Sequence, residues 1–188
     1  MSDKLPLMHS PLEDHPEYTK ALGMIGIEIG VLEIALGEML GAILGINTDL
    51  SQIIYMTPQS YIGRLQILEN VIEAVMKPDA SGTKALLGYI SQTKARIQYR
   101  NDAMHSVWGV KTSDKSVVTR RPVPLVDKKP QIPVPITELQ DQISKLRKLS
   151  AEVYAEVKIV IEQRAALEAQ LQKERKQGLH AKKIKGGP

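Results

Sequence analysis

The sequence contains no cysteine and no phenylalanine, and only one tryptophan and six tyrosines. Without cysteine, the chain has no disulfide bond, thiolate nucleophile, zinc finger or iron–sulfur cluster. Because aromatic side chains are so scarce, aliphatic residues must fill the core, which favours helix-on-helix packing over an aromatic-rich β-sandwich. Catalysis by imidazole has only four candidates: His9, His15, His105 and His180.

Length and charge distribution predict one domain with two basic appendages. The chain has 188 residues, enough for a single domain, and its 43% hydrophobic and 24% charged residues are typical of a globular protein. The net charge of +4 is uneven, since residues 111–129 hold six Lys or Arg against two Asp, and residues 173–188 hold six against one Glu. Such segments either attract polyanions or are simply solvated.

Neither the N-terminal residues nor the most apolar stretch has the pattern of a targeting or membrane segment. Residues 1–15 contain two prolines and no apolar run of signal-peptide length, so we expect an extended arm. Residues 21–46 are mostly apolar but contain Glu28, Glu33 and Glu38. Steps of five residues place these carboxylates about 140° apart around a helix. Because a lipid-facing carboxylate is costly, we predict a buried helix, no membrane span and a cytoplasmic protein.

Capping residues and apolar spacing predict four principal helices. Proline is favoured in a first turn, glycine ends helices, and apolar residues at spacings of three and four mark a buried face. We expect a helix from Pro16 to Gly45, a helical turn over 49–56, a helix capped by Thr57 and Pro58 that runs to Met76, a helix from Thr83 to about Tyr99 or beyond, and a last helix of nearly forty residues from Thr137. Six glycines in the first helix would let a neighbouring helix approach closely.

The pattern changes between the third and fourth principal helices. Residues 112–136 are expected to form a basic, proline-rich insertion, and Val110 and Val117 flank residues 112–115 at its start, a pattern typical of a small hairpin. The Lys- and Gly-rich residues 177–188 predict a disordered tail. We therefore expect an all-α fold, an up-and-down bundle of four principal helices that makes residues 16–176 one domain.

The segment from Tyr99 to Trp108 reads YRNDAMHSVW and brings together the side chains that phosphodiester cleavage needs. Arg100 offers a rigid fork of donors that matches two phosphate oxygens. His105 can exchange protons near neutral pH. When a ribose hydroxyl attacks its neighbouring phosphate, a base removes the hydroxyl proton and a cation stabilises the charged phosphate oxygens. Arg100 and His105 therefore predict a catalytic site that needs no metal, in which Asn101 orients one of the two side chains.

This order of residues resembles the signature of HEPN domains, a family of small helical-bundle proteins that includes many metal-independent RNase toxins. The family's hallmark is an arginine, four to six residues, then a histidine, often with a polar residue directly after the arginine. Arg100, Asn101 and His105 match it, in the helical context that the family implies. The resemblance implies a homodimer whose two motifs meet in one cleft, and RNA cleavage that leaves a cyclic phosphate. A toxin of this kind would also have a cognate antitoxin as a partner.

The spacing of the motif makes a geometric demand, because Arg100 and His105 point about 140° apart on a straight helix. They meet at one phosphate if the helix bends at Asn101 and Asp102, which are weak helix formers and good caps. Alternatively, a twofold axis brings His105 of one subunit towards Arg100 of the other. Both arrangements predict a partly polar, buried interface.

Other residues near the motif have both functional and structural interpretations. Lys94, Arg96 and Asp102 could bind the substrate, and Tyr99 and Trp108 could stack on bases or fill the core. Structurally, Arg100 could instead pair with Glu33 or Glu38 of the first helix, and the same glutamates could join the site. No cluster has metal-ligand spacing, so we predict no metal and no cofactor.

Three hypotheses follow from the sequence. The leading one is a HEPN-type endoribonuclease with Arg100, Asn101 and His105 as catalytic residues and RNA as substrate. The alternative is a non-catalytic module of the same fold that binds a nucleotide, RNA or another protein. The third is a structural partner protein that uses the heptad-like last helix as a handle.

Overall fold

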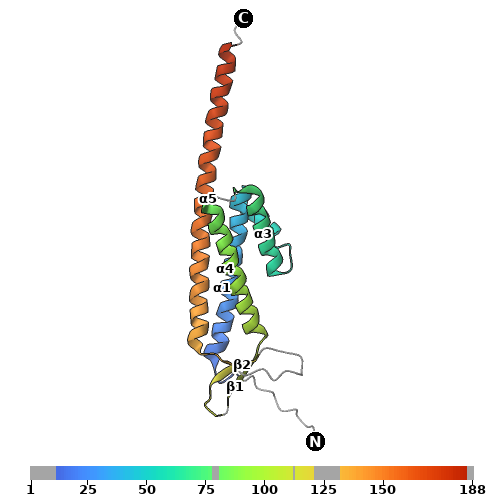
Figure 1. Ribbon diagram of the computed structural model, residues 1–188, viewed down its shortest axis with the longest axis vertical. Helices are drawn as coiled ribbons and strands as arrows, with labels where there is room; N and C mark the ends of the chain where they lie inside the picture. Colours follow the sequence, from blue (N-terminus) through green and yellow to red (C-terminus); the bar gives the residue numbers. More distant parts are fainter. Residues whose placement is uncertain (1–11, 78–80, 112, 121–131, 186–188) are drawn as a thin grey trace. The chain divides into compact units, whose positions relative to one another are not determined.

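The computed structural model describes residues 12–77, 81–111, 113–120 and 132–185. The described residues form five helices: α1 (Pro16–Leu44), α2 (Thr48–Met56), α3 (Tyr61–Val75), α4 (Ser81–His105) and α5 (Ile136–Lys185). They also form three short strands: β1 (Val107–Val110), β2 (Val117–Arg120) and β3 (Ile132–Pro133) (Figure 1). The predicted all-α class is confirmed, with α1, α3, α4 and α5 as its principal helices.

The chain divides into two compact units, and α1, α4 and α5 each contribute residues to both. The first unit comprises residues 1–33 and 88–150, and the second comprises residues 34–87 and 151–188. The prediction of one bundle domain over residues 16–176 stays a prediction.

The first unit packs the beginning of α1, the end of α4 and the beginning of α5 around an aliphatic core. Two polar contacts tie these helices together. Arg147 of α5 donates to Glu28 of α1 over 2.7 Å, and Arg96 of α4 donates to Gln142 of α5 over 2.5 Å. The buried apolar side chains of this core are Ile25, Ile29 and Leu32 of α1, Ile90 and Ile97 of α4, and Leu139, Leu146 and Leu149 of α5.

A three-stranded antiparallel sheet follows the end of α4 in the order β1-β2-β3. The β1–β2 hairpin is confirmed, and its turn is held by Asp114, which accepts hydrogen bonds from the Ser116 backbone and hydroxyl at 3.0 and 2.6 Å. These hydrogen bonds lower the pKa of Asp114. Strand β3 is not predicted by the sequence, because two residues that include a proline carry no strand signal. The remainder of the predicted insertion, residues 121–131, lies outside the described residues.

The second unit packs the end of α1 against α2, α3 and the later part of α5. Its buried side chains include Leu36, Met39 and Leu40 of α1, Leu65, Leu68 and Ile72 of α3, and Val153 and Val157 of α5. The predicted close approach at the glycines of the first helix is confirmed at Gly37 and Gly41. A Cβ atom at these positions would lie 2.5 Å from Gln52 and 2.7 Å from Ser51 of α2. A Cβ at Gly23 or Gly30 would meet nothing within 4 Å.

Two predicted element boundaries are wrong. Thr57 and Pro58 do not begin α3; Thr57 is the C-cap of α2, and its hydroxyl donates to the Ile53 carbonyl over 2.8 Å. The N-cap of α3 is Ser60, which accepts from the Gly63 backbone at 3.0 Å. The last helix is also longer than predicted, because α5 continues to Lys185 through most of the segment predicted as a disordered tail.

The sequence predicts an extended arm over residues 1–15, but residues 12–14 form a turn. The His15 backbone N–H donates to the Leu12 carbonyl in this turn. No single helix among the described residues is long and apolar enough to cross a membrane. The pair α1 and α2 passes this test of length and composition together, with a bend of 117° between its members.

Candidate functional site

The predicted motif lies in the last turns of α4, which is continuous to His105, so the first of the two expected arrangements, a helix broken at Asn101 and Asp102, is not found. Both side chains bond within their own helix instead of capping a new one. Asn101 accepts from Arg100 Nη1 at 3.0 Å, and Asp102 accepts from Gln98 Nε2 at 3.1 Å. The helix ends at His105, and the next residue, Ser106, donates its hydroxyl to the Asp102 carbonyl.

Because α4 is continuous through the motif, the five-residue spacing places Arg100 and His105 about 140° apart around its axis. Arg100 is half-buried and shares a side of α4 with the buried residues Thr93 and Ile97. His105 is exposed, in the last turn of the helix. A single chain therefore does not bring the guanidinium and the imidazole to one phosphate.

The structure couples Asn101 to Arg100, as an orienting role requires. The Arg100 Nη1 to Asn101 Oδ1 hydrogen bond limits the rotation of a long side chain. Asn101 is itself half-buried. Of the three predicted catalytic residues, Arg100 and Asn101 are therefore in contact with each other.

The predicted substrate-binding cations are in different positions. Arg96 lies one helical turn before Arg100 on the same side of α4, but its Nη1 donates to Gln142 of α5. Lys94 is half-buried and lies about 120° around the axis from Arg100. Of the two, only Arg96 could extend a phosphate track from Arg100.

The glutamates weighed as partners of Arg100 belong to different parts of the molecule. Glu33 is buried at 6% exposure in the first unit, whereas Glu38 belongs to the second unit. Glu28, another glutamate of α1, is buried and forms an ion pair with Arg147. The buried positions of Glu28 and Glu33 agree with the interpretation of this apolar stretch as a core helix.

A cavity of about 190 Å³ opens beside the motif, on the side of Asp102. Tyr99, Trp108 and Glu138 line it together with Asp102. The remaining lining residues are Ala103, Ser106, Thr119, Ile132 and Val134. Arg100 and His105 do not line it. Asp102, Tyr99 and Trp108 are candidates that the sequence already indicates. Thr119 of β2 and Glu138 of α5 are not, because no local sequence pattern shows that they lie close to the end of α4.

Hydrogen bonds hold the two aromatic walls of this cavity in place. Tyr99 donates to Glu138 Oε1 over 3.1 Å, and burial together with this carboxylate raises the pKa of Tyr99. Trp108 Nε1 donates to the Ala103 carbonyl over 2.9 Å, and its ring meets that of Tyr18 edge-on at 6.1 Å. The Tyr18 hydroxyl donates to the Val134 carbonyl over 2.9 Å, which ties α1 to the chain after β3.

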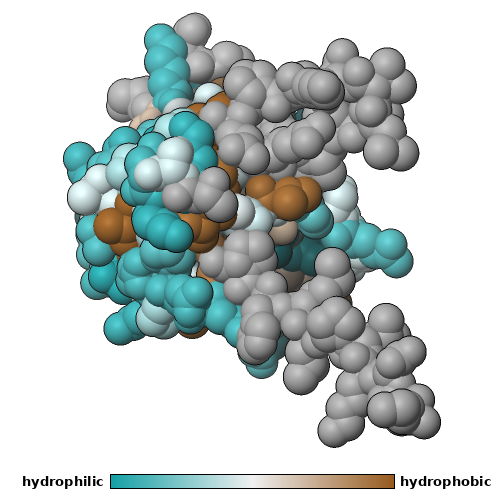
Figure 2. All heavy atoms as spheres, turned by 90° about the horizontal axis from the view of Figure 1, so that it is seen from below, coloured by the Kyte–Doolittle hydropathy of each residue, from teal (hydrophilic) through white to brown (hydrophobic). Residues whose placement is uncertain are grey.

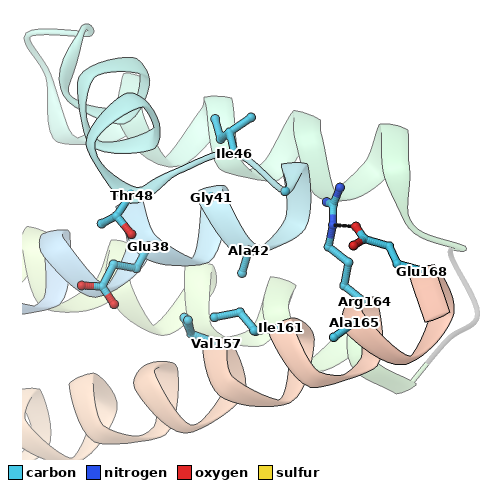
Figure 3. A pocket seen from close by; sticks show the side chains of 11 residues that line it. Glu38, Gly41, Ala42, Ile46, Thr48, Val157, Ile161, Arg164, Ala165 and Glu168 are labelled. Atoms are coloured by element: carbon cyan, nitrogen blue, oxygen red, sulfur yellow. Dashed lines mark hydrogen bonds and ion pairs between the residues drawn. The ribbon is translucent and has the colours of Figure 1, made fainter.

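A second cavity, of about 340 Å³, lies in the second unit between α1, the start of α2 and α5 (Figure 3). Glu38 and Thr48 lie at one end, and Arg164 with Glu168 at the other. Arg164 donates to Glu168 over 3.0 Å and to the Ile43 carbonyl over 3.1 Å. The guanidinium thus caps the last turn of α1, where a cation also complements the helix dipole.

Figure 2 shows mostly hydrophilic side chains on the described part of the face that it views, with small, separate hydrophobic patches. Among the described residues, no three His, Asp or Glu side chains gather where they could hold a metal ion. No protein-family model matches the chain, and comparisons with curated proteins and with solved structures give no match either.

Proposed function

We propose that this protein is a HEPN-type, metal-independent endoribonuclease whose catalytic site is completed by a second copy of the chain. The observation that supports the proposal is the arrangement of the motif on a continuous α4: a hydrogen-bonded Arg100–Asn101 pair and an exposed His105 on another side of the helix. Because one chain does not bring these groups together, a twofold axis must supply His105 from the partner.

In such a site the three residues have separate tasks. Arg100, held by Asn101, binds the phosphate oxygens and stabilises the charge that develops on them. His105 removes the proton from the ribose 2′-hydroxyl, whose oxygen attacks the adjacent phosphorus. The bond from phosphorus to the 5′-oxygen breaks, this oxygen takes up a proton from water, and the products are a 2′,3′-cyclic phosphate and a 5′-hydroxyl end.

A complementation experiment tests the shared site. Arg100→Ala and His105→Ala each remove one group, so each homodimer is inactive towards RNA in EDTA. In a mixed dimer one of the two sites keeps both Arg100 and His105, so an equilibrated equal mixture should recover about a quarter of the wild-type rate. Gel assays of a fluorescent RNA measure that rate, and Lys145→Ala, an exposed substitution on α5, serves as the control.

The outcomes separate the hypotheses. Inactive single variants with no recovery on mixing would show that both groups act within one chain, against the shared site. Unchanged cleavage by His105→Ala would exclude His105 from catalysis.

The alternative function, RNA or nucleotide binding without catalysis, is favoured by the same divergence of Arg100 and His105 within one chain. It predicts salt-sensitive RNA binding that Arg100→Ala weakens, with no strand scission by the wild-type protein at any concentration. A cytoplasmic location and a cognate antitoxin stay predictions.

A further inference from the structure

We propose that the 190 Å³ cavity beside the motif binds a guanine base of the RNA, so that cleavage occurs next to guanosine. This inference rests on the proposed function, since it gives the substrate of the same site a preferred sequence.

The lining provides two aromatic rings and two carboxylates. Tyr99 and Trp108 offer surfaces on which a base can stack, and their hydrogen bonds to Glu138 and the Ala103 carbonyl fix both rings before a ligand binds. Asp102 and Glu138 are the only charged side chains that line the cavity within the described part of the chain. The cavity is therefore rich in hydrogen-bond acceptors.

Such a lining selects a ligand that donates. A carboxylate accepts at about four lone-pair positions, and Tyr99 occupies one of those of Glu138. Guanine has two adjacent donors on its Watson–Crick edge, N1–H and the 2-amino group, which match the two oxygens of one carboxylate. Adenine and cytosine place a ring acceptor beside their amino group, and uracil flanks its single N–H with two carbonyl oxygens, so each would meet a carboxylate with repulsion.

Size and position agree with this ligand. The volume is below the roughly 300–1,000 Å³ of sites for drug-sized ligands, so it suits one ring system and not a whole nucleotide. Asp102 lies three residues before His105, about 4.5 Å along the helix axis. A base bound there would leave its sugar and phosphate near the end of α4, where the motif lies.

Trp108 makes the test direct, because it is the only tryptophan and it lines the cavity. The full-length protein is titrated with guanosine, inosine, adenosine, cytidine and uridine, and Trp108 fluorescence is corrected with N-acetyltryptophanamide. We expect guanosine to change the emission saturably. Inosine, which lacks the 2-amino group, should bind about tenfold more weakly, and the other three nucleosides more weakly still.

Two variants locate the recognition. Glu138→Gln replaces one acceptor oxygen by a donor and should weaken guanosine binding about tenfold, while its amide oxygen still accepts from Tyr99. Asp141→Asn is the matched control, since Asp141 is a half-exposed carboxylate on the same helix that pairs with Lys145 and does not line the cavity. It should leave guanosine binding unchanged.

Each contrary result overturns the inference. Equal binding of all five nucleosides would show stacking alone, no saturable change would show that the cavity takes no base, and binding of arginine amide but not of guanosine would show a site for a cationic side chain. Nucleosides contain no phosphodiester, so the two proposals fail separately: guanosine binding without RNA cleavage contradicts the proposed function, and cleavage without preference for guanosine contradicts only this inference.

Discussion

At the scale of single residues, Gly45 shows how one backbone conformation fixes the end of a long helix. Its φ of +66° lies in the left-handed region, and its backbone N–H donates to the Gly41 carbonyl over 2.7 Å. A Cβ atom at this position would overlap the guanidinium of Arg164. Glycine is therefore needed both for the turn and for the cation that caps α1.

Gly45→Ala should lower the free energy of unfolding by about 1–3 kcal/mol, because the side chain disfavours the left-handed backbone and displaces Arg164 from the Ile43 carbonyl. Urea denaturation followed by circular dichroism measures the change. Gly23→Ala is the control: a Cβ there meets nothing within 4 Å inside α1, and the substitution should stabilise the protein by up to about 1 kcal/mol. Equal effects of the two substitutions would contradict this account.

At the scale of helices, two ion pairs of α5 differ in how exposed to solvent their carboxylate is. Arg147 contacts Glu28, whose side chain is only 11% exposed, whereas Lys145 pairs with Asp141, which is 50% exposed. Removing Arg147 leaves a buried carboxylate without this cation, and removing Lys145 leaves a solvated one.

Arg147→Ala should therefore cost more stability than Lys145→Ala. We expect about 1–2 kcal/mol for the first, a value reduced for the exposure of Arg147, and under about 0.5 kcal/mol for the second. Parallel urea denaturation of the two variants measures both changes. If the double variant Glu28→Gln with Arg147→Ala is as unstable as Arg147→Ala alone, the stranded charge is not the cause.

At the scale of the whole molecule, three helices contribute to both compact units. A helix gains stability cooperatively along its length, so the loss of packing in one unit weakens helices that the other unit also uses. We therefore expect the chain to unfold in one transition.

The substitution Leu68→Ala, at a fully buried position of the second unit, tests this expectation. It should lower stability by about 2–5 kcal/mol, and it should shift the fluorescence transition of Trp108 in the first unit as far as the circular-dichroism transition of all helices. A Trp108 transition that stays in place while the circular-dichroism midpoint falls would show that the units unfold independently.

The sequence by itself determined the helical class, the long helices and the β1–β2 hairpin, because apolar spacing, caps and turn residues act between neighbours in the chain. The limits of local pattern are visible in α3, where Leu65, Leu68 and Ile72 are buried but Ile62, which shares their apolar spacing, is 53% exposed. The N-cap of α3 at Ser60 and the full length of α5 were not predicted either. In both places the sequence offers more than one possible helix boundary, and packing decides which one the chain adopts.

The tertiary structure alone decided how the candidate site is built. The motif residues could be named from their chemistry, but the sequence left open whether α4 breaks at Asn101 and Asp102; in the structure it continues, and both side chains bond within the helix. The cavity joins Tyr99 of α4 to Thr119 of β2 and Glu138 of α5. Long-range packing brings these residues together. The periodicity of a single segment shows which of its own residues share a face, but not which residues of other segments lie next to them.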